Sequence, residues 1–138
     1  MQNDKTLETK QKLSQALVKM MYTKPISKIT VTAIVAKCGL NRKTFYYHFI
    51  DIYDLFEYTI NQDILNELES LDLITNLSTA IRMIIRYINK NKRLIINVIN
   101  DVRIDEIKLF FKNNFNKIIR KYIEELIQVN QYKISNEF

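Results

Sequence analysis

The stretch that decides the fold runs from Thr30 to Phe49 and reads TVTAIVAKCGLNRKTFYYHF. Thr30 can cap a short helix over about 31–37, and Gly39, the only glycine in the chain, suits the left-handed backbone that follows such a helix. Asn41 can cap a second helix over about 42–48. Two short helices joined around one glycine predict a helix-turn-helix unit.

The second of these helices carries side chains typical of a DNA-reading element. Phe45 and Phe49 are four residues apart, so we expect both rings to turn inward. The remaining side chains face outward or flank that side: Arg42, Lys43, Thr44, Tyr46, Tyr47 and His48. Tyr46 and Tyr47 could also be plain packing residues. Cationic, hydroxyl and aromatic groups on one short helix favour contact with base edges and phosphates in a major groove.

The charge of the chain is concentrated where this unit lies. The net charge is +6, and residues 1–50 carry nine Lys or Arg against two Asp or Glu. Residues 51–90 carry three basic against seven acidic residues, and residues 91–138 carry nine basic against six acidic residues. A basic N-terminal third indicates a polyanionic partner, although a solvated lysine-rich face is the plain alternative. The change of sign predicts a helix-turn-helix DNA-binding domain over 1–50 and a second helical domain over 51–138.

The rest of the chain is also predicted to be helical. Of its 138 residues, 47% are apolar, and a single Gly and a single Pro leave few tight turns, so we expect an all-α fold. A helix is predicted over about 7–23, with Thr6 as its cap and Pro25 beyond its end, and another over about 52–73, with Asp51 as its cap. Three more helices are predicted: one from Asn76 onward, one over about 92–100 and one over about 103–130. The last of these has an apolar face wide enough to need partners on more than one side.

Several classes of protein are disfavoured by what the sequence lacks. Cys38 is the only cysteine, which excludes an intramolecular disulfide and a cysteine-based zinc cluster, and we expect it to be a small buried side chain. No paired carboxylates, Ser/His/acid set or glycine-rich phosphate loop stands out, so neither an enzyme nor a cofactor is predicted. No apolar run approaches the length of a membrane span, and no signal core is visible, so we expect a cytoplasmic protein without a membrane partner.

The region from Thr30 to Phe56 resembles the signature of the TetR/AcrR family of transcriptional regulators. The matching residues are Thr30, Ile34, Ala36, Gly39, Leu40, Thr44, Phe45, Tyr46, Tyr47, His48, Phe49, Asp51 and Leu55. The run from Asn41 to Phe56 is especially similar to the subgroup typified by the regulator of dihydroxyacetone kinase operons. Two positions depart from the family pattern: Lys43 stands where Gly, Pro or a polar residue is frequent, and Ile52 where a phosphate-binding Lys is frequent.

The resemblance implies a DNA-binding regulator, a repressor that acts as a homodimer on a palindromic operator in double-stranded DNA. Its second domain would bind a small-molecule effector and dimerise, although family members add about two further helices after the seventh. The nine candidate DNA-binding residues are Thr30, Thr32, Asn41, Arg42, Lys43, Thr44, Tyr46, Tyr47 and His48. The N-terminus of the helix that follows would hold phosphate by backbone N–H groups alone.

Within this set, the groove geometry suggests different roles. Arg42 or Lys43 could reach the O6/N7 edge of guanine, and Thr44 or Tyr46 could touch a thymine methyl or a phosphate. Thr30, Thr32, Tyr47 and His48 are better placed for phosphates, and for His48 a packing role at the helix end is an equal alternative. The competing interpretation of the whole chain is a non-enzymatic interaction module that keeps the helix-turn-helix as a scaffold.

Overall fold

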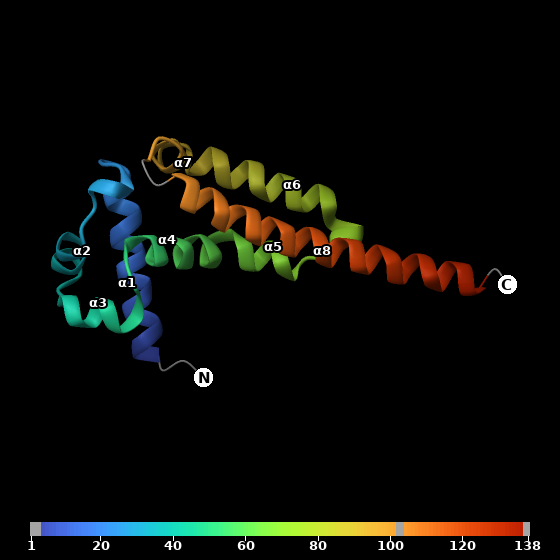
Figure 1. Cartoon of the computed structure of the whole chain (residues 1–138), viewed down its shortest axis with the longest axis horizontal. Helices are drawn as coiled ribbons and strands as arrows, with labels where there is room; N and C mark the ends of the chain where they lie inside the picture. The colour runs from blue at the N-terminus through green and yellow to red at the C-terminus, as the bar shows by residue number, and fades with distance from the viewer. Residues whose placement is uncertain (1–3, 102–103, 137–138) are drawn as a thin grey trace.

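The computed structural model describes residues 4–101 and 104–136, and within these ranges the chain forms helices and no β-strand. Side chains are described as far as residue 130. The short helices of the N-terminal lobe lie at one end of the molecule, and a long helix runs away from them to the C-terminus (Figure 1). The all-α prediction is confirmed. In the described ranges, no helix combines the length and the apolarity that crossing a membrane requires.

The N-terminal lobe consists of α1 (Asp4–Met21), the 3-10 turn η1 (Ile26–Lys28), α2 (Val31–Cys38) and α3 (Arg42–His48). The predicted start of the first helix is wrong, because Thr6 lies inside α1 and Asp4 already occupies its first turn. Its predicted end is also too late, since α1 stops at Met21 and Pro25 serves as the N-cap residue of η1. The bounds of α3 agree with the prediction.

The helix-turn-helix connection is built by local hydrogen bonds. The Thr30 hydroxyl oxygen accepts the N–H of Ala33 at 3.1 Å and so caps α2. At the other end Gly39 has a φ of 65°, and the N–H of Leu40 donates to the Val35 carbonyl at 2.9 Å. This pattern ends a helix with a left-handed residue that costs least when no Cβ is present. The predicted roles of Thr30 and Gly39 are confirmed.

A second group of helices follows as one continuous rod: α4 (Ile52–Ile60), the π-helical turn η2 (Asn61–Leu65) and α5 (Asn66–Ser70). The prediction of a single helix over 52–73 holds for most of this length, but the helix ends at Ser70. Leu71 takes an extended backbone with ψ 140°, and Asp72 then begins the next helix. The π turn was not predicted.

The C-terminal part contains α6 (Leu73–Lys90), α7 (Lys92–Ile99) and α8 (Ile104–Asn136). The expected cap at Asn76 is wrong, because Asp72 caps α6 by accepting the N–H of Ile74 at 3.1 Å. Asn76 instead has non-helical dihedral angles, φ −122° and ψ 19°, and kinks α6. The bounds of α7 agree with the prediction to within a residue. Helix α8 extends further than predicted, and residue 103, the predicted start, lies outside the described residues.

One apolar core runs through both lobes. Its buried members include Leu13, Leu17, Met21, Ile34 and Phe45 in the N-terminal lobe, Leu55, Phe56, Ile60 and Ile64 along the central rod, and Leu94, Val98, Ile107 and Phe110 in α7 and α8. Helix α4 packs on α1 and also faces α8, so it links the N-terminal lobe to the C-terminal part of the chain. The division into domains 1–50 and 51–138 stays a prediction.

Candidate nucleic-acid interface

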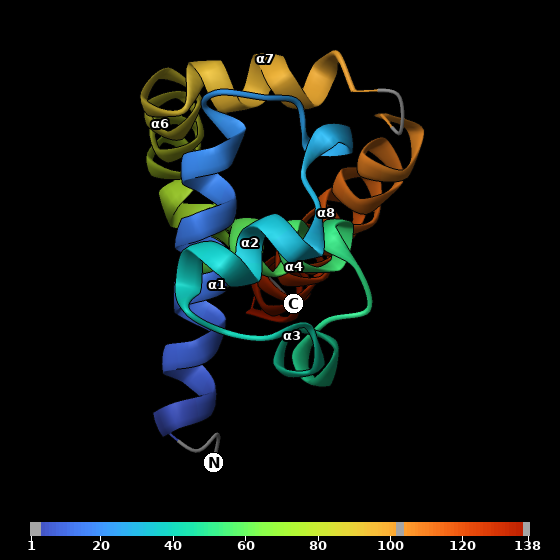
Figure 2. The ribbon, with the colours of Figure 1, turned by 90° about the vertical axis from the view of Figure 1, so that its left-hand side faces the viewer.

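The outer side of α3 is open to solvent. Arg42, Lys43 and Tyr46 are exposed, whereas the Phe45 ring is fully buried and Phe49 is buried beside it. Figure 2 shows α3 on the side of the molecule that faces away from α7. The predicted division of this helix into an inner aromatic face and an outer polar face is confirmed, and the outer face is accessible to a large partner.

Arg42 and Tyr46 form a pair on this outer face. The guanidinium carbon lies 5.8 Å from the centroid of the tyrosine ring, and Nη2 donates to the phenolic oxygen at 3.5 Å. A guanidinium over an aromatic ring gains a cation–π attraction and loses part of its rotamer freedom. Most of the five N–H donors of the Arg42 guanidinium remain available, so the pair can present partly ordered donors to the acceptor edge of a guanine.

Asn41 and Thr44 are partly occupied by the cap of α3. The Asn41 Oδ1 accepts both the N–H of Thr44 at 2.8 Å and its hydroxyl proton at 3.1 Å. The Thr44 hydroxyl has therefore used its one proton and cannot also donate to a phosphate in this geometry. Its methyl group remains suited to a thymine methyl, and the amide nitrogen of Asn41 remains a donor.

The two threonines of α2 lie at its exposed N-terminal end. Thr30 uses its oxygen as an acceptor for the Ala33 N–H, which leaves its own hydroxyl proton for another partner. Thr32 is exposed in the first turn of the same helix. The helix dipole also makes this end positive. Both side chains can therefore donate to a phosphate, and their contact with DNA stays a prediction.

Tyr47 and His48 at the end of α3 differ strongly in exposure. Tyr47 is 81% exposed, whereas His48 is half-buried and packs edge-on against the Tyr47 ring, with 4.9 Å between centroids. Burial, and then the nearby charge of Lys10, lower the pKa of the His48 imidazole. A neutral ring gives phosphate little electrostatic attraction, so the geometry favours the packing alternative for His48 and leaves the outward position to Tyr47.

The N-terminus of α4 is occupied by carboxylates. Asp51 Oδ1 accepts the N–H of Asp54 at 2.9 Å, and Asp54 Oδ2 accepts the N–H of Ile50 at 2.8 Å. Burial, followed by the charges of Asp54 and Asp51, raises the pKa of Glu57 one turn further on. The cap thus takes one N–H of the first turn of α4, the Asp54 N–H, and the two carboxylates place negative charge where an anion would bind. Phosphate binding by the backbone N–H groups of this end stays a prediction.

Residues 13–59 match the family model described as "Bacterial regulatory proteins, tetR family". This range includes the capped α2, the glycine turn, the exposed α3 and most of α4. Residues 13–59 are thus similar to the N-terminal domain of that family, and we call this segment the TetR domain. The nine candidate DNA-binding residues all lie within this TetR domain. The likeness to the dihydroxyacetone kinase subgroup stays a prediction.

A solved structure shares the fold beyond the TetR domain. It is a Clostridium perfringens protein described as a "putative fatty acid metabolism regulator", and it superimposes with a TM-score of 0.53 at 18% sequence identity. The match covers 91% of this chain and 87% of that chain. At this identity the likeness shows a common fold alone. No curated protein shows a significant sequence match to this chain.

The charge at the start of α4 leads to a prediction for the TetR domain. Asp51→Asn keeps an N-cap oxygen but removes one negative charge near the expected DNA backbone. We expect DNA affinity to rise by a factor of about two to five at low salt, and by less as added salt screens the charge. Fluorescence anisotropy with a labelled duplex measures the change. Asp105→Asn in α8 makes the same charge change far from α3 and should leave affinity unaltered; an equal gain in both variants would contradict the placement.

Two further side chains near this surface were not predicted. Ile50 is 82% exposed between the end of α3 and the start of α4, and Lys10 of α1 lies with its ammonium 5.2 Å from the centroid of the Tyr58 ring. Ile50 could have been found, because it separates the inward Phe49 from the Asp51 cap. The position of Lys10 could not, since it depends on how α1 packs against α4.

Cys38 fits the predicted packing role. It is half-buried, its thiol donates to the Lys12 carbonyl at 3.4 Å, and burial raises the pKa of the thiol. A raised pKa leaves little thiolate at neutral pH, so the group is a poor nucleophile. Among the residues that the structure describes, no three His, Cys, Asp or Glu side chains gather as a metal site.

Proposed function

We propose that the chain is a DNA-binding transcriptional regulator, a cytoplasmic repressor that responds to a small-molecule effector. The observation that carries this proposal is the exposed outer face of α3, with Arg42, Lys43 and Tyr46 uncovered on a TetR domain. No neighbouring helix of the described chain masks this face. The basic charge of residues 1–50 adds a long-range attraction for duplex DNA.

The proposed contacts divide by their chemistry. With α3 in the major groove, Arg42 and Lys43 read guanine edges and Tyr46 or the Thr44 methyl contacts a neighbouring base. Thr30, Thr32 and Tyr47 donate to phosphates on either side, which fixes the register without reading sequence. Asn41 contributes its free amide donors.

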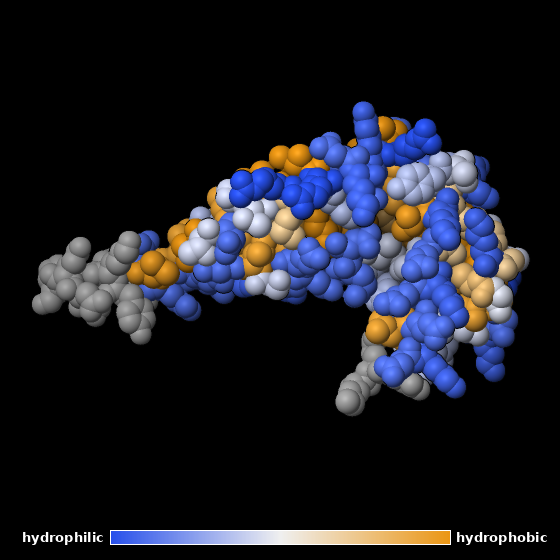
Figure 3. Space-filling view, turned by 180° about the vertical axis from the view of Figure 1, so that it is seen from behind, coloured by the Kyte–Doolittle hydropathy of each residue, from blue (hydrophilic) through white to orange (hydrophobic). Residues whose placement is uncertain are grey.

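We further propose that the repressor is a homodimer joined through its C-terminal helices. Helix α8 buries Ile107 and Phe110 in the core but leaves a second stripe exposed, consisting of Phe111, Phe115, Ile119, Ile123 and Ile127. Helix α6 exposes Leu77, Ile81, Ile84, Ile85 and Ile88. Apolar side chains are visible in Figure 3 along the edge where α6 lies. Unpartnered apolar faces of this extent favour self-association, and a twofold dimer matches a palindromic operator.

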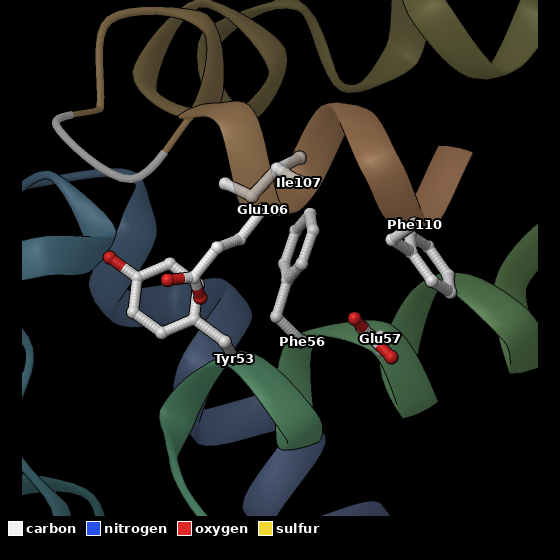
Figure 4. Close-up of a pocket in the computed structure, with 6 residues that line it drawn as sticks. All are labelled: Tyr53, Phe56, Glu57, Glu106, Ile107 and Phe110. Atoms are coloured by element: carbon white, nitrogen blue, oxygen red, sulfur yellow. The ribbon is translucent and has the colours of Figure 1, made fainter. Parts of the chain in front are cut away.

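The effector would act through the space between α4 and α8. A cavity of about 20 Å³ lies there, lined by Tyr53, Phe56, Glu57, Glu106, Ile107 and Phe110 (Figure 4). That volume holds about one water molecule. An organic effector therefore requires the two helices to separate, and displacement of α4 would move the TetR domain, whose last residues belong to α4.

The alternative of a protein-interaction module is separated from this proposal by the response of binding to salt. A regulator that neutralises several phosphates should lose affinity for duplex DNA by about 10³-fold or more between about 50 and 200 mM salt. An interaction module should show no such binding at either concentration. Selection of bound sequences from a random duplex pool then tests whether the DNA is recognised as a palindrome; an absence of any enriched sequence would contradict the repressor.

Arg42 provides the corresponding test of sequence reading. Arg42→Ala should cost about 1–3 kcal/mol on the preferred duplex and should relax the preference for one base position. Affinity for unrelated duplexes should change much less, because phosphate contacts remain. Arg93→Ala removes the same side chain from the exposed surface of α7 and serves as the control. Equal losses on all duplexes would assign Arg42 to the backbone instead of to a base.

A further inference from the structure

A buried carboxylate connects three segments that are distant in sequence. Asp101, just beyond α7, is only 4% exposed. Its Oδ2 accepts the backbone N–H of Ser27 in η1 at 2.8 Å, and its Oδ1 accepts the phenolic proton of Tyr53 at 2.9 Å. One side chain of the C-terminal part thus holds both the turn that leads into α2 and the first turn of α4.

A second side chain of the same region holds the end of α1. The Asn97 amide in α7 donates to the carbonyl of Met21 and to that of Lys24, the latter at 3.3 Å. Both acceptors belong to backbone between the end of α1 and the start of η1. Figure 2 shows α7 lying across this end of α1. Together, Asn97 and Asp101 bind four groups of other segments, and we name this arrangement the α7 clamp.

The chemistry of the α7 clamp differs from that of the surrounding core. Apolar contacts between α1, α4 and α7 stabilise association but tolerate small shifts, because the hydrophobic effect is not directional. Buried hydrogen bonds to backbone groups are directional, and breaking one leaves a desolvated polar group unpaired. The bonds to Ser27, Met21 and Lys24 therefore specify where the segment that enters α2 lies relative to α7.

We propose that Asp101 and Asn97 are positioning residues, and that the α7 clamp sets the orientation of the helix-turn-helix, α2 and α3, relative to α4 and α8. In its consequence for DNA, this inference rests on the proposed function. In a dimer joined through α6 and α8, that orientation determines the separation of the two α3 helices and hence the accepted spacing of half-sites. Tyr53 also lines the cavity between α4 and α8, so a ligand that enters there competes with the bond to Asp101.

The test compares two tyrosines of α4. Tyr53→Phe removes one hydroxyl from the α7 clamp, while Tyr58→Phe removes a buried hydroxyl that has no hydrogen-bond partner in the described chain. Asp101→Ala is a second variant, which removes both oxygens that accept the Ser27 N–H and the Tyr53 hydroxyl proton. Spin labels at Lys37→Cys and Asn113→Cys in a Cys38→Ser background report the distance between α2 and α8. Dilution with unlabelled protein removes distances between protomers.

We expect a broader distance distribution in Tyr53→Phe and Asp101→Ala than in the parent, and an unchanged one in Tyr58→Phe. Selection from duplexes with variable half-site spacing should show that the first two variants lose the preference for one spacing while keeping the half-site sequence. An unchanged distance distribution in both clamp variants would overturn the inference. If the parent binds no DNA, the proposed function fails, and the distance measurement still decides whether the clamp positions the lobe.

Discussion

Phe115→Glu should convert the protein to a monomer and lower operator affinity by about 100-fold, because the two half-sites can then no longer be bound by one linked pair of domains. Phe115 is the most exposed member of the apolar stripe on α8, at 61%. A carboxylate there would be desolvated in a dimer but solvated in the monomer, so the substitution penalises association and not folding. Light scattering at micromolar concentrations and DNA anisotropy measure the two effects.

The matched control is Asn113→Glu, which adds the same charge to α8 two residues away, on a different side of the helix. It should leave both the molecular mass and the affinity for DNA unchanged. Helical content and thermal unfolding of Phe115→Glu should match those of the parent at dilute concentration. A Phe115→Glu protein that remains dimeric would place the interface elsewhere, and a parent that is already monomeric would remove the dimer from the proposal.

Phe45→Ala should lower the free energy of unfolding by about 3–5 kcal/mol, since it empties the centre of the TetR domain. The Phe45 ring is fully buried, and it packs against the rings of Tyr46 and Phe49 with centroid distances of 5.4 and 5.8 Å. No neighbouring helix can fill a cavity of that size without losing its own contacts. Urea unfolding followed by circular dichroism measures the loss.

Tyr47→Ala on the same helix should lower the affinity for DNA and leave the free energy of unfolding almost unchanged. Its ring lies in solvent, so we expect the free energy of unfolding to change by less than about 0.5 kcal/mol. DNA affinity should fall on all duplexes alike, because the proposed partner of Tyr47 is a phosphate. Strong destabilisation by Tyr47→Ala, or a stable Phe45→Ala protein, would contradict the assignment of inner and outer faces on α3.

The helix-turn-helix was predictable because its signals are local. Thr30 and Asn41 cap helices by bonding N–H groups three residues ahead, and Gly39 supplies its backbone conformation without help from other segments. Sequence spacing alone therefore placed α2 and α3 to within a residue. Where two capping residues compete, as Asp72 and Asn76 do, local signals are ambiguous, and packing of Leu73 in the core accompanies the earlier start.

The candidate site was predictable in its exposed residues and not in its electrostatics. The outward positions of Arg42, Lys43 and Tyr46 follow from helical periodicity once the phenylalanines are placed inside. The carboxylate bonds at the start of α4 depend on the side-chain rotamers of Asp51 and Asp54, which the spacing of residues does not determine. Asp101 was invisible to sequence reasoning, since its partners Ser27 and Tyr53 are 74 and 48 residues away.

The π turn η2 has a consequence for the length of the central rod. Buried side chains recur at every fourth position along it, at Ile52, Phe56, Ile60, Ile64 and Leu68. In a regular α-helix such a row winds around the axis by about 40° at each step, because four residues exceed one turn. The wider turn at residues 61–65 takes up part of this winding and keeps the far half of the row directed at the same neighbours. Deleting a single residue there would replace the wide turn by a regular one with nearly the same total rotation, so α5 would keep the same side toward α8. The π turn is therefore the place where the rod can lose one residue without changing the contacts of its two halves.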